Sequence, residues 1–212
     1  EKNVASLFSR RYCVLTGSGT AALFCIFNAL ELSEGTQVLY PVNTCETAVN
    51  AAVFAGLKPV FLDVDMKTFN LPEQKIIQLI KNVNIPVVVG THLFGQLMDL
   101  QKIEKQLAAN KAILIEDSAQ AYGGEINSKK AGQIGFASII SFGPGKLLDC
   151  SGGGAILTDS EEFHQKICRV ANSLQNNPQI KLEMRQKMMR EMFVLGKQAL
   201  TPKAFSEKRQ EI

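Results

Sequence analysis

Short apolar runs alternate with amphipathic segments between residues 21 and 115, and this alternation constrains the fold more than any other feature. Four runs have the length and β-branched content of buried strands: residues 38–40, 59–62, 86–89 and 112–115. The segments with apolar residues at helical spacing are 21–32, 46–55, 72–81 and 99–110. Because right-handed crossovers keep successive strands parallel, the pattern predicts an α/β fold, a three-layer α/β/α domain with a mostly parallel sheet.

Composition is that of a folded protein, with 46% hydrophobic and 20% charged residues in a chain of 212. No run of about 18 apolar residues is present, and residues 1–11 are too polar for a signal peptide. We therefore expect a cytoplasmic protein without membrane insertion. The five cysteines lack the close pairs of zinc or redox motifs, which predicts reduced thiols and no metal site.

The second half of the chain follows a different pattern. After residue 116 the segments are shorter and richer in glycine, with strands predicted at 137–141 and 155–157 and a long helix from about residue 161. We assign residues 1–177 to a large domain and 178–212 to a helical basic tail with eight basic and four acidic residues. A solvated helix face explains the basic charge better than nucleic-acid binding does.

A glycine turn after the apolar segment 12–15 leaves three interpretations open. Gly17, Gly19 and Ala22 form a G-x-G-x-x-A pattern, which occurs in dinucleotide-binding domains. Such domains also need an acidic residue at the end of the second strand, where this chain has Tyr40 and Pro41. The same turn suits a monophosphate bound at a helix N-terminus, or a plain N-cap.

Two predicted strands end in residues that carry chemistry. Residues 113–120 read ILIEDSAQ, a strand that runs into Glu116 and Asp117, whose carboxylates could cap a turn or pair with a protonated heterocyclic nitrogen. Residues 138–146 read SIISFGPGK and place Lys146 after a glycine turn. The C-terminal ends of parallel strands share one edge of the sheet, so this edge is the predicted active site. Three consecutive glycines at 152–154 predict a close approach by another group.

Taken in order, these motifs make the chain resemble the DegT-type sugar aminotransferases of the aspartate aminotransferase superfold, over about residues 8–159. The resemblance rests on SGTAAL at 18–23, PVFLDVD at 59–65, THLFGQ at 91–96, EDSAQA at 116–121, and SFGPGK with GGGA at 141–155. It implies pyridoxal 5'-phosphate (PLP) as cofactor, a keto sugar nucleotide as substrate, an amino-acid donor and a homodimer.

Residue roles follow from the same resemblance. Lys146 would form the Schiff base with PLP, Asp117 would pair with the pyridinium nitrogen, and Gln120 would contact the ring hydroxyl. The phosphate would be held by three small residues, namely Gly19, Thr20 and Ser141.

Cys45 stands where many members of that family place an aromatic residue over the cofactor ring. It either replaces the ring stack or is a small buried hydrophobic residue. Related sugar dehydratases carry histidine in place of the lysine, and Lys146 argues against their chemistry. His92 and His164 are expected in structural roles.

The sequence leaves two rival functions to weigh. The superfold's small C-terminal domain is not recognisable in these 212 residues, so activity is less firmly expected than cofactor binding. The first rival is a truncated paralogue that acts as a partner or regulatory subunit, with the methionine-rich stripe at 184–192 as its interface. The second is a nicotinamide-dinucleotide enzyme built on the glycine turn.

Overall fold

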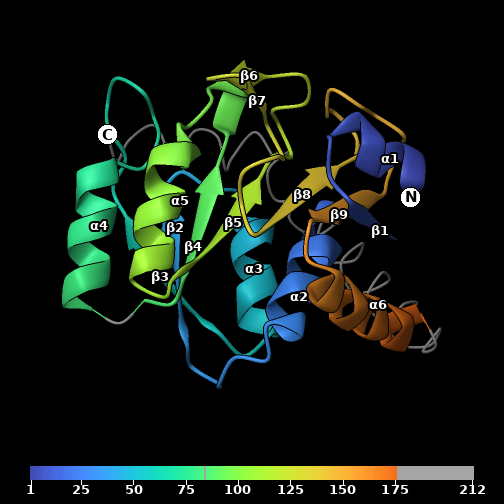
Figure 1. Ribbon diagram of the computed structural model, residues 1–212, viewed down its shortest axis with the longest axis horizontal. Coiled ribbons are helices and arrows are strands. Elements are labelled where there is room, and N and C mark those ends of the chain that lie inside the picture. Colours follow the sequence, from blue (N-terminus) through green and yellow to red (C-terminus); the bar gives the residue numbers. More distant parts are fainter. Residues whose placement is uncertain (84, 176–212) are drawn as a thin grey trace, which may run out of the picture. The chain divides into compact units, whose positions relative to one another are not determined.

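The computed structural model describes residues 1–83 and 85–175. Strands and helices follow one another along most of this part of the chain (Figure 1). The helices are α1 (Lys2–Leu7), α2 (Gly19–Ala29), α3 (Glu46–Phe54), α4 (Glu73–Asn82), the 3-10 turn η1 (Leu93–Gly95), α5 (Leu100–Ala109) and α6 (Glu161–Gln175). The strands are β1 (Tyr12–Thr16), β2 (Gln37–Pro41), β3 (Lys58–Leu62), β4 (Val87–Thr91), β5 (Ile113–Asp117), β6 (Glu125–Ile126), β7 (Lys129–Lys130), β8 (Ala137–Ser141) and β9 (Gly154–Thr158).

Seven of the strands form one sheet in the order β1-β9-β8-β5-β4-β2-β3. Strands β8, β5, β4, β2 and β3 are parallel, and β9 runs antiparallel to both of its neighbours, β8 and β1. The predicted mostly parallel sheet is confirmed. The carboxyl ends of the parallel strands lie at one edge, where β9 begins, because Ser141 is the register partner of Gly154.

Helices cover both faces of this sheet, as a three-layer fold requires. Helices α2, α3 and α6 pack on one face, against a core that includes Val89, Ile115 and Ile139. Helices α4 and α5 pack on the other face against Val88 and Leu114, and are seen in front of the sheet in Figure 1. Strands β2, β4, β5, β8 and β9 have buried side chains on both sides, which explains why they read as continuous hydrophobic runs rather than as alternating ones.

The contacts of the described residues group Glu1–Ala171 into one compact unit, and a second unit begins at Asn172. The predicted basic tail at 178–212 and its methionine stripe lie outside the described residues, so the domain boundary at residue 177 stays a prediction.

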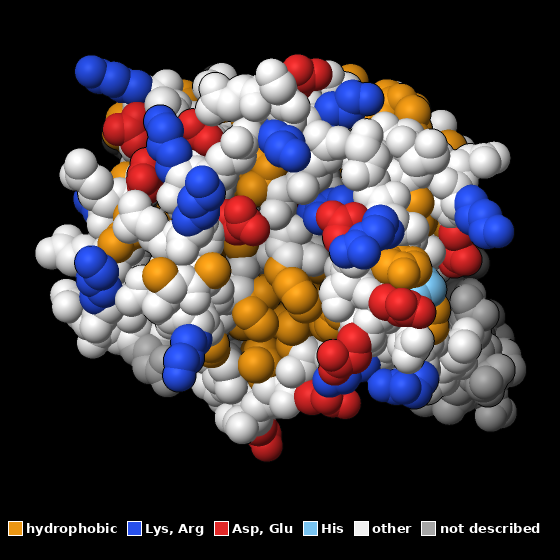
Figure 2. Space-filling view, viewed as in Figure 1, with side chains coloured by type: hydrophobic (Ala, Val, Ile, Leu, Met, Phe, Trp, Pro, Cys, Tyr) orange, Lys and Arg blue, Asp and Glu red, His pale blue; other side chains and the backbone are white. Residues whose placement is uncertain are grey.

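Helix α1 and the two-stranded β6–β7 hairpin were not expected, because both are too short to show a periodic pattern. Basic and acidic side chains are interspersed on the face shown in Figure 2.

Candidate active site

The N-terminus of helix α2 lies directly beside the end of strand β8. Ser18 caps the helix, because its hydroxyl accepts a 3.0 Å hydrogen bond from the N–H of Ala21. A Cβ placed on Gly19 would lie 3.1 Å from the Cβ of Ser141 and 3.4 Å from its Oγ. Gly19 is buried and Thr20 is half-buried in the first turn of the helix. The first N–H groups of α2 and the Ser141 hydroxyl therefore lie together, an arrangement that suits a phosphate.

Gly154 makes this approach possible. A Cβ on Gly154 would lie 2.5 Å from the carbonyl carbon of Ser18 and 2.7 Å from the N of Gly19, both backbone atoms that cannot move alone. Gly153 has φ +102 and donates its N–H to the carbonyl of Gly17 at 3.1 Å. The predicted close approach to the glycine run is confirmed.

Replacing Gly154 with alanine should therefore destabilise the fold at the start of α2. We expect the free energy of unfolding to fall by about 1–3 kcal/mol, the usual effect of overpacking, in a denaturant titration followed by circular dichroism. Gly17→Ala is the matched control, because a Cβ there meets nothing within 4 Å. Its stability should change by less than about 0.5 kcal/mol. Equal stability of the two variants would show that the helix start is not held against β9.

Asp117 is the last residue of β5 and is only 5% exposed. Alternation along the strand places its side chain on the same face as Ile115, toward α2 and α3. Its Oδ1 accepts a 3.0 Å hydrogen bond from the N–H of Ala119, which leaves the other carboxylate oxygen without a partner among the described residues. Burial raises the pKa of Asp117, against the opposing effects of the Ala119 hydrogen bond and the positive charge of Lys146.

Lys146 follows the turn that leaves strand β8. Its N–H donates to the carbonyl of Gly143 at 3.2 Å, and Gly145, with φ +76, donates its N–H to Oδ2 of Asp149 at 2.9 Å. The Lys146 side chain is half-buried, and no hydrogen bond or ion pair joins its ammonium to any residue in the described ranges. Its positive charge opposes the effect of burial on the pKa of Asp117. Both residues follow or end parallel strands at the same edge of the sheet, Asp117 at the end of β5 and Lys146 after β8.

Gln120 and Cys45 lie on two other loops at this edge of the sheet. Gln120 is half-buried, and its Oε1 accepts a 3.0 Å hydrogen bond from the N–H of Phe94. Cys45 precedes α3 with an exposed thiol, whose Sγ lies 3.2 Å from Oγ1 of Thr47. The interpretation of Cys45 as a small buried residue is therefore wrong, because its thiol faces solvent. Its role as a ring-stacking group stays a prediction.

Comparison with known proteins decides the family. The model of the DegT/DnrJ/EryC1/StrS aminotransferase family matches residues 1–196. The chain belongs to this family.

Three relatives illustrate the likeness of this aminotransferase-family chain to known proteins. It is 34% identical over 168 residues to dTDP-3-amino-3,6-dideoxy-alpha-D-galactopyranose transaminase of Aneurinibacillus thermoaerophilus, covering 79% of this chain and 46% of that one. It is 31% identical over 171 residues to a pleiotropic regulatory protein of Geobacillus stearothermophilus, covering 80% and 45%. The crystal structure of NtdA from Bacillus subtilis with bound cofactor PMP superposes with a TM-score of 0.70 at 30% identity, covering 79% and 38%. The chain spans less than half the length of these relatives.

In this DegT-family chain, Glu116 adjoins Asp117 in sequence but has a structural role, because it binds the backbone of a neighbouring loop. It is fully buried on the opposite face of the sheet, where its carboxylate accepts hydrogen bonds from the N–H groups of Gly132 (2.7 Å), Ile134 (2.8 Å) and Gly135 (3.1 Å). His92 lies 3.0 Å away through Nε2. Burial raises the pKa of Glu116, but the hydrogen bonds from His92 and the backbone outweigh it and hold that pKa below its usual range.

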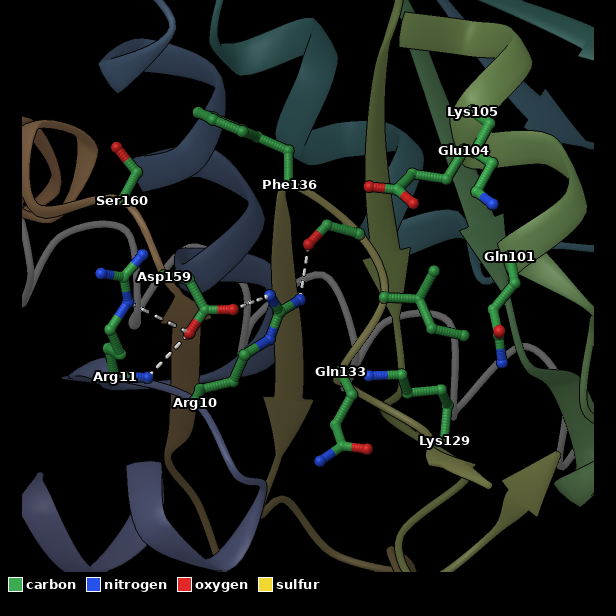
Figure 3. Close-up of a pocket in the computed structure, with 12 residues that line it drawn as sticks. Arg10, Arg11, Gln101, Glu104, Lys105, Lys129, Gln133, Phe136, Asp159 and Ser160 are labelled. Carbon is green, nitrogen blue, oxygen red and sulfur yellow. Dashed lines mark hydrogen bonds and ion pairs between the residues drawn. The ribbon is translucent and has the colours of Figure 1, made fainter. Parts of the chain in front are cut away.

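Arg10 was not singled out by the sequence, yet it is only 8% exposed. It binds backbone carbonyls of the 132–135 loop, whose N–H groups donate to Glu116. Its guanidinium donates to the carbonyls of Gly132 and Gly135, to the Ser138 hydroxyl and to the Asp159 carboxylate at 2.8 Å. Figure 3 shows the contact between Arg10 and Asp159. Nothing in the sequence separates Arg10 from its exposed neighbour Arg11, so only the tertiary structure could identify it.

A cavity of about 470 Å³ lies beside Arg10, between α5 and the Asp159 turn (Figure 3). Its wall includes Phe136, which precedes β8, and Asp159, which follows β9. Both residues are at the ends of these strands opposite to Ser141 and Gly154, so the cavity is remote from the candidate site. Ligands of parallel α/β sheets bind at the carboxyl ends of the strands, where this cavity does not lie.

His92 and His164 both have structural contacts, as expected. His164 stacks on Tyr12 with ring centroids 4.8 Å apart. Within residues 1–83 and 85–175, no cluster of three or more histidine, cysteine or acidic side chains could hold a metal ion. No helix in the same ranges has the length and apolar character needed to cross a bilayer. The cytoplasmic location stays a prediction.

Proposed function

We propose that this chain is the PLP-binding part of an aminotransferase that acts on a keto sugar nucleotide. The observation that carries the proposal is the gathering of three groups at one edge of the sheet. The start of α2 with Ser141 suits a phosphate, the buried Asp117 carboxylate suits a protonated ring nitrogen, and Lys146 supplies a primary amine. PLP carries a phosphate, a pyridine nitrogen and an aldehyde, so the residues present fit this cofactor.

Each residue has a distinct task in this proposal. When bound, PLP supplies the electron-withdrawing ring that transamination requires. The N–H groups at Gly19 and Thr20, with the Ser141 hydroxyl, orient the phosphate. Asp117 keeps the ring nitrogen protonated, because an ionised carboxylate in a buried site stabilises a neighbouring cation strongly. The Lys146 amine anchors the cofactor and, when free, carries a proton to and from the substrate Cα.

The substrate class and the assembly are inferred from other observations. The relative from A. thermoaerophilus is a transaminase of a dTDP-linked sugar, which favours a sugar nucleotide here. We also propose a homodimer, since cyclic dimers are the commonest soluble assemblies. Large apolar side chains exposed on this chain agree with a covered surface, among them Phe54, Phe61 and Leu147.

Titration of the purified 212-residue chain with PLP tests the proposal. We expect a visible absorbance band that saturates with cofactor, and borohydride reduction should leave a pyridoxyl group on the peptide that contains Lys146. Nicotinamide dinucleotides should produce no saturable change, which would exclude the dinucleotide alternative. Sedimentation of the same sample checks the dimer.

A colourless protein that resists reconstitution would contradict the proposal. It would favour the regulatory alternative, which the likeness to the pleiotropic regulatory protein of G. stearothermophilus makes specific.

A further inference from the structure

The segment between β4 and α5, residues 92–98, is anchored through His92 to β5, the strand that carries Asp117. The His92 N–H donates to the Asp117 carbonyl at 3.0 Å. The His92 ring is only 1% exposed, and its Nδ1 accepts a 3.0 Å hydrogen bond from the Met98 N–H. Because Nδ1 is the acceptor, Nε2 carries the ring proton and donates it to the Glu116 carboxylate. These contacts fix the 92–98 segment beside the candidate active site.

Phe94, at the tip of the 92–98 segment, has an unusual backbone conformation. Its φ is +55 and its ψ is 26, the left-handed region that large residues seldom adopt. Its side chain is 79% exposed, so packing of the ring does not account for the conformation. The main-chain N–H of Phe94 instead points to Gln120 and donates to its Oε1 at 3.0 Å.

This hydrogen bond determines which way the Gln120 amide faces. An amide oxygen accepts and an amide nitrogen only donates, so the Phe94 N–H can pair with Oε1 but not with Nε2. Gln120 Nε2 has no partner among the described residues and is left as a free donor. A fixed donor three residues after Asp117 suits the ring oxygen of PLP, which is an acceptor when ionised.

We propose that Phe94 is a positioning residue, whose left-handed backbone orients Gln120 so that its amide nitrogen donates to the ring oxygen of PLP. The proposal rests on the proposed function, because it requires PLP at this site. A donor to that oxygen stabilises the more negative form of the bound cofactor. It therefore lowers the pH at which the visible band of the bound cofactor changes.

Two substitutions of Phe94 separate its backbone from its side chain. Asparagine tolerates the left-handed region, whereas β-branched valine does not. Phe94→Asn should keep the midpoint pH of the absorbance change within about 0.2 unit of wild type. Phe94→Val should raise it by about 0.5–1 unit, the equivalent of one ordinary hydrogen bond. Gln120→Leu, which removes the donor, is the reference and should raise it by a similar amount.

Every other pattern overturns the proposal. If both Phe94 variants shift the midpoint, the aromatic side chain is responsible; if only Gln120→Leu does so, Gln120 needs no help from Phe94. An unshifted Gln120→Leu variant shows that this side chain does not reach the ring. A wild-type chain without a cofactor band overturns the proposed function as well, whereas a normal wild-type band with unshifted variants overturns this proposal alone.

Discussion

Replacing Lys146 with alanine is expected to abolish covalent attachment of PLP while leaving the fold intact. The lysine-linked absorbance band should be absent, and borohydride should leave no pyridoxyl group on the chain. In the protein that carries the activity, turnover should fall by at least about 100- to 10,000-fold, the usual contribution of a positioned acid–base group. The free energy of unfolding should change by less than about 0.5 kcal/mol, because no hydrogen bond or ion pair within the described residues uses the Lys146 ammonium.

An exposed lysine provides the matched control for this variant. Lys130→Ala removes the same side chain from strand β7, outside the candidate site, and should leave both the absorbance band and the turnover unchanged. If the Lys146→Ala protein is still trapped by borohydride on another lysine, Lys146 is not the attachment point.

Asp117→Asn is expected to separate cofactor binding from catalysis. Asparagine keeps the oxygen that accepts from the Ala119 N–H, so the local turn should survive. It cannot supply the negative charge that keeps a ring nitrogen protonated. We expect part of the cofactor band to remain while turnover falls by about 100- to 1,000-fold, the usual effect of losing one preorganised electrostatic contact. Activity close to wild type would show that Asp117 does not face the ring nitrogen.

Asp117→Asn should lower turnover but should not lower the stability of the cofactor-free protein. Burial raises the pKa of Asp117, so this carboxyl stabilises the fold when protonated, and that contribution is lost as the pH rises through the folded-state pKa. At neutral pH the asparagine variant should therefore unfold at an equal or higher denaturant concentration than wild type. The difference should shrink as the pH falls through the folded-state pKa, and denaturant titrations at several pH values measure it.

The location of the candidate residues in the fold could be predicted from the sequence, because they stand next to strands that are recognisable by themselves. Asp117 ends the apolar run of β5. Lys146 follows the glycine turn that comes after the apolar run of β8. The C-terminal ends of parallel strands necessarily share one edge of a sheet, so order along the chain was enough to place both groups together. Cys45 could not be placed in this way, since a small side chain at a helix start is compatible with burial or exposure.

The sequence by itself determined the α/β class, the strands and helices around the site, and the glycine run beside the α2 N-terminus, since periodicity and turn residues act locally. Only the tertiary structure showed what surrounds each of the two adjacent carboxylates. Glu116 and Asp117 are adjacent, and strand alternation sends them to opposite faces. Glu116 accepts hydrogen bonds from three backbone N–H groups, whereas one carboxylate oxygen of Asp117 has no partner in the part of the chain that the structure describes. Arg10 and the strained Phe94 likewise became visible only in three dimensions, because their partners lie far away in the chain.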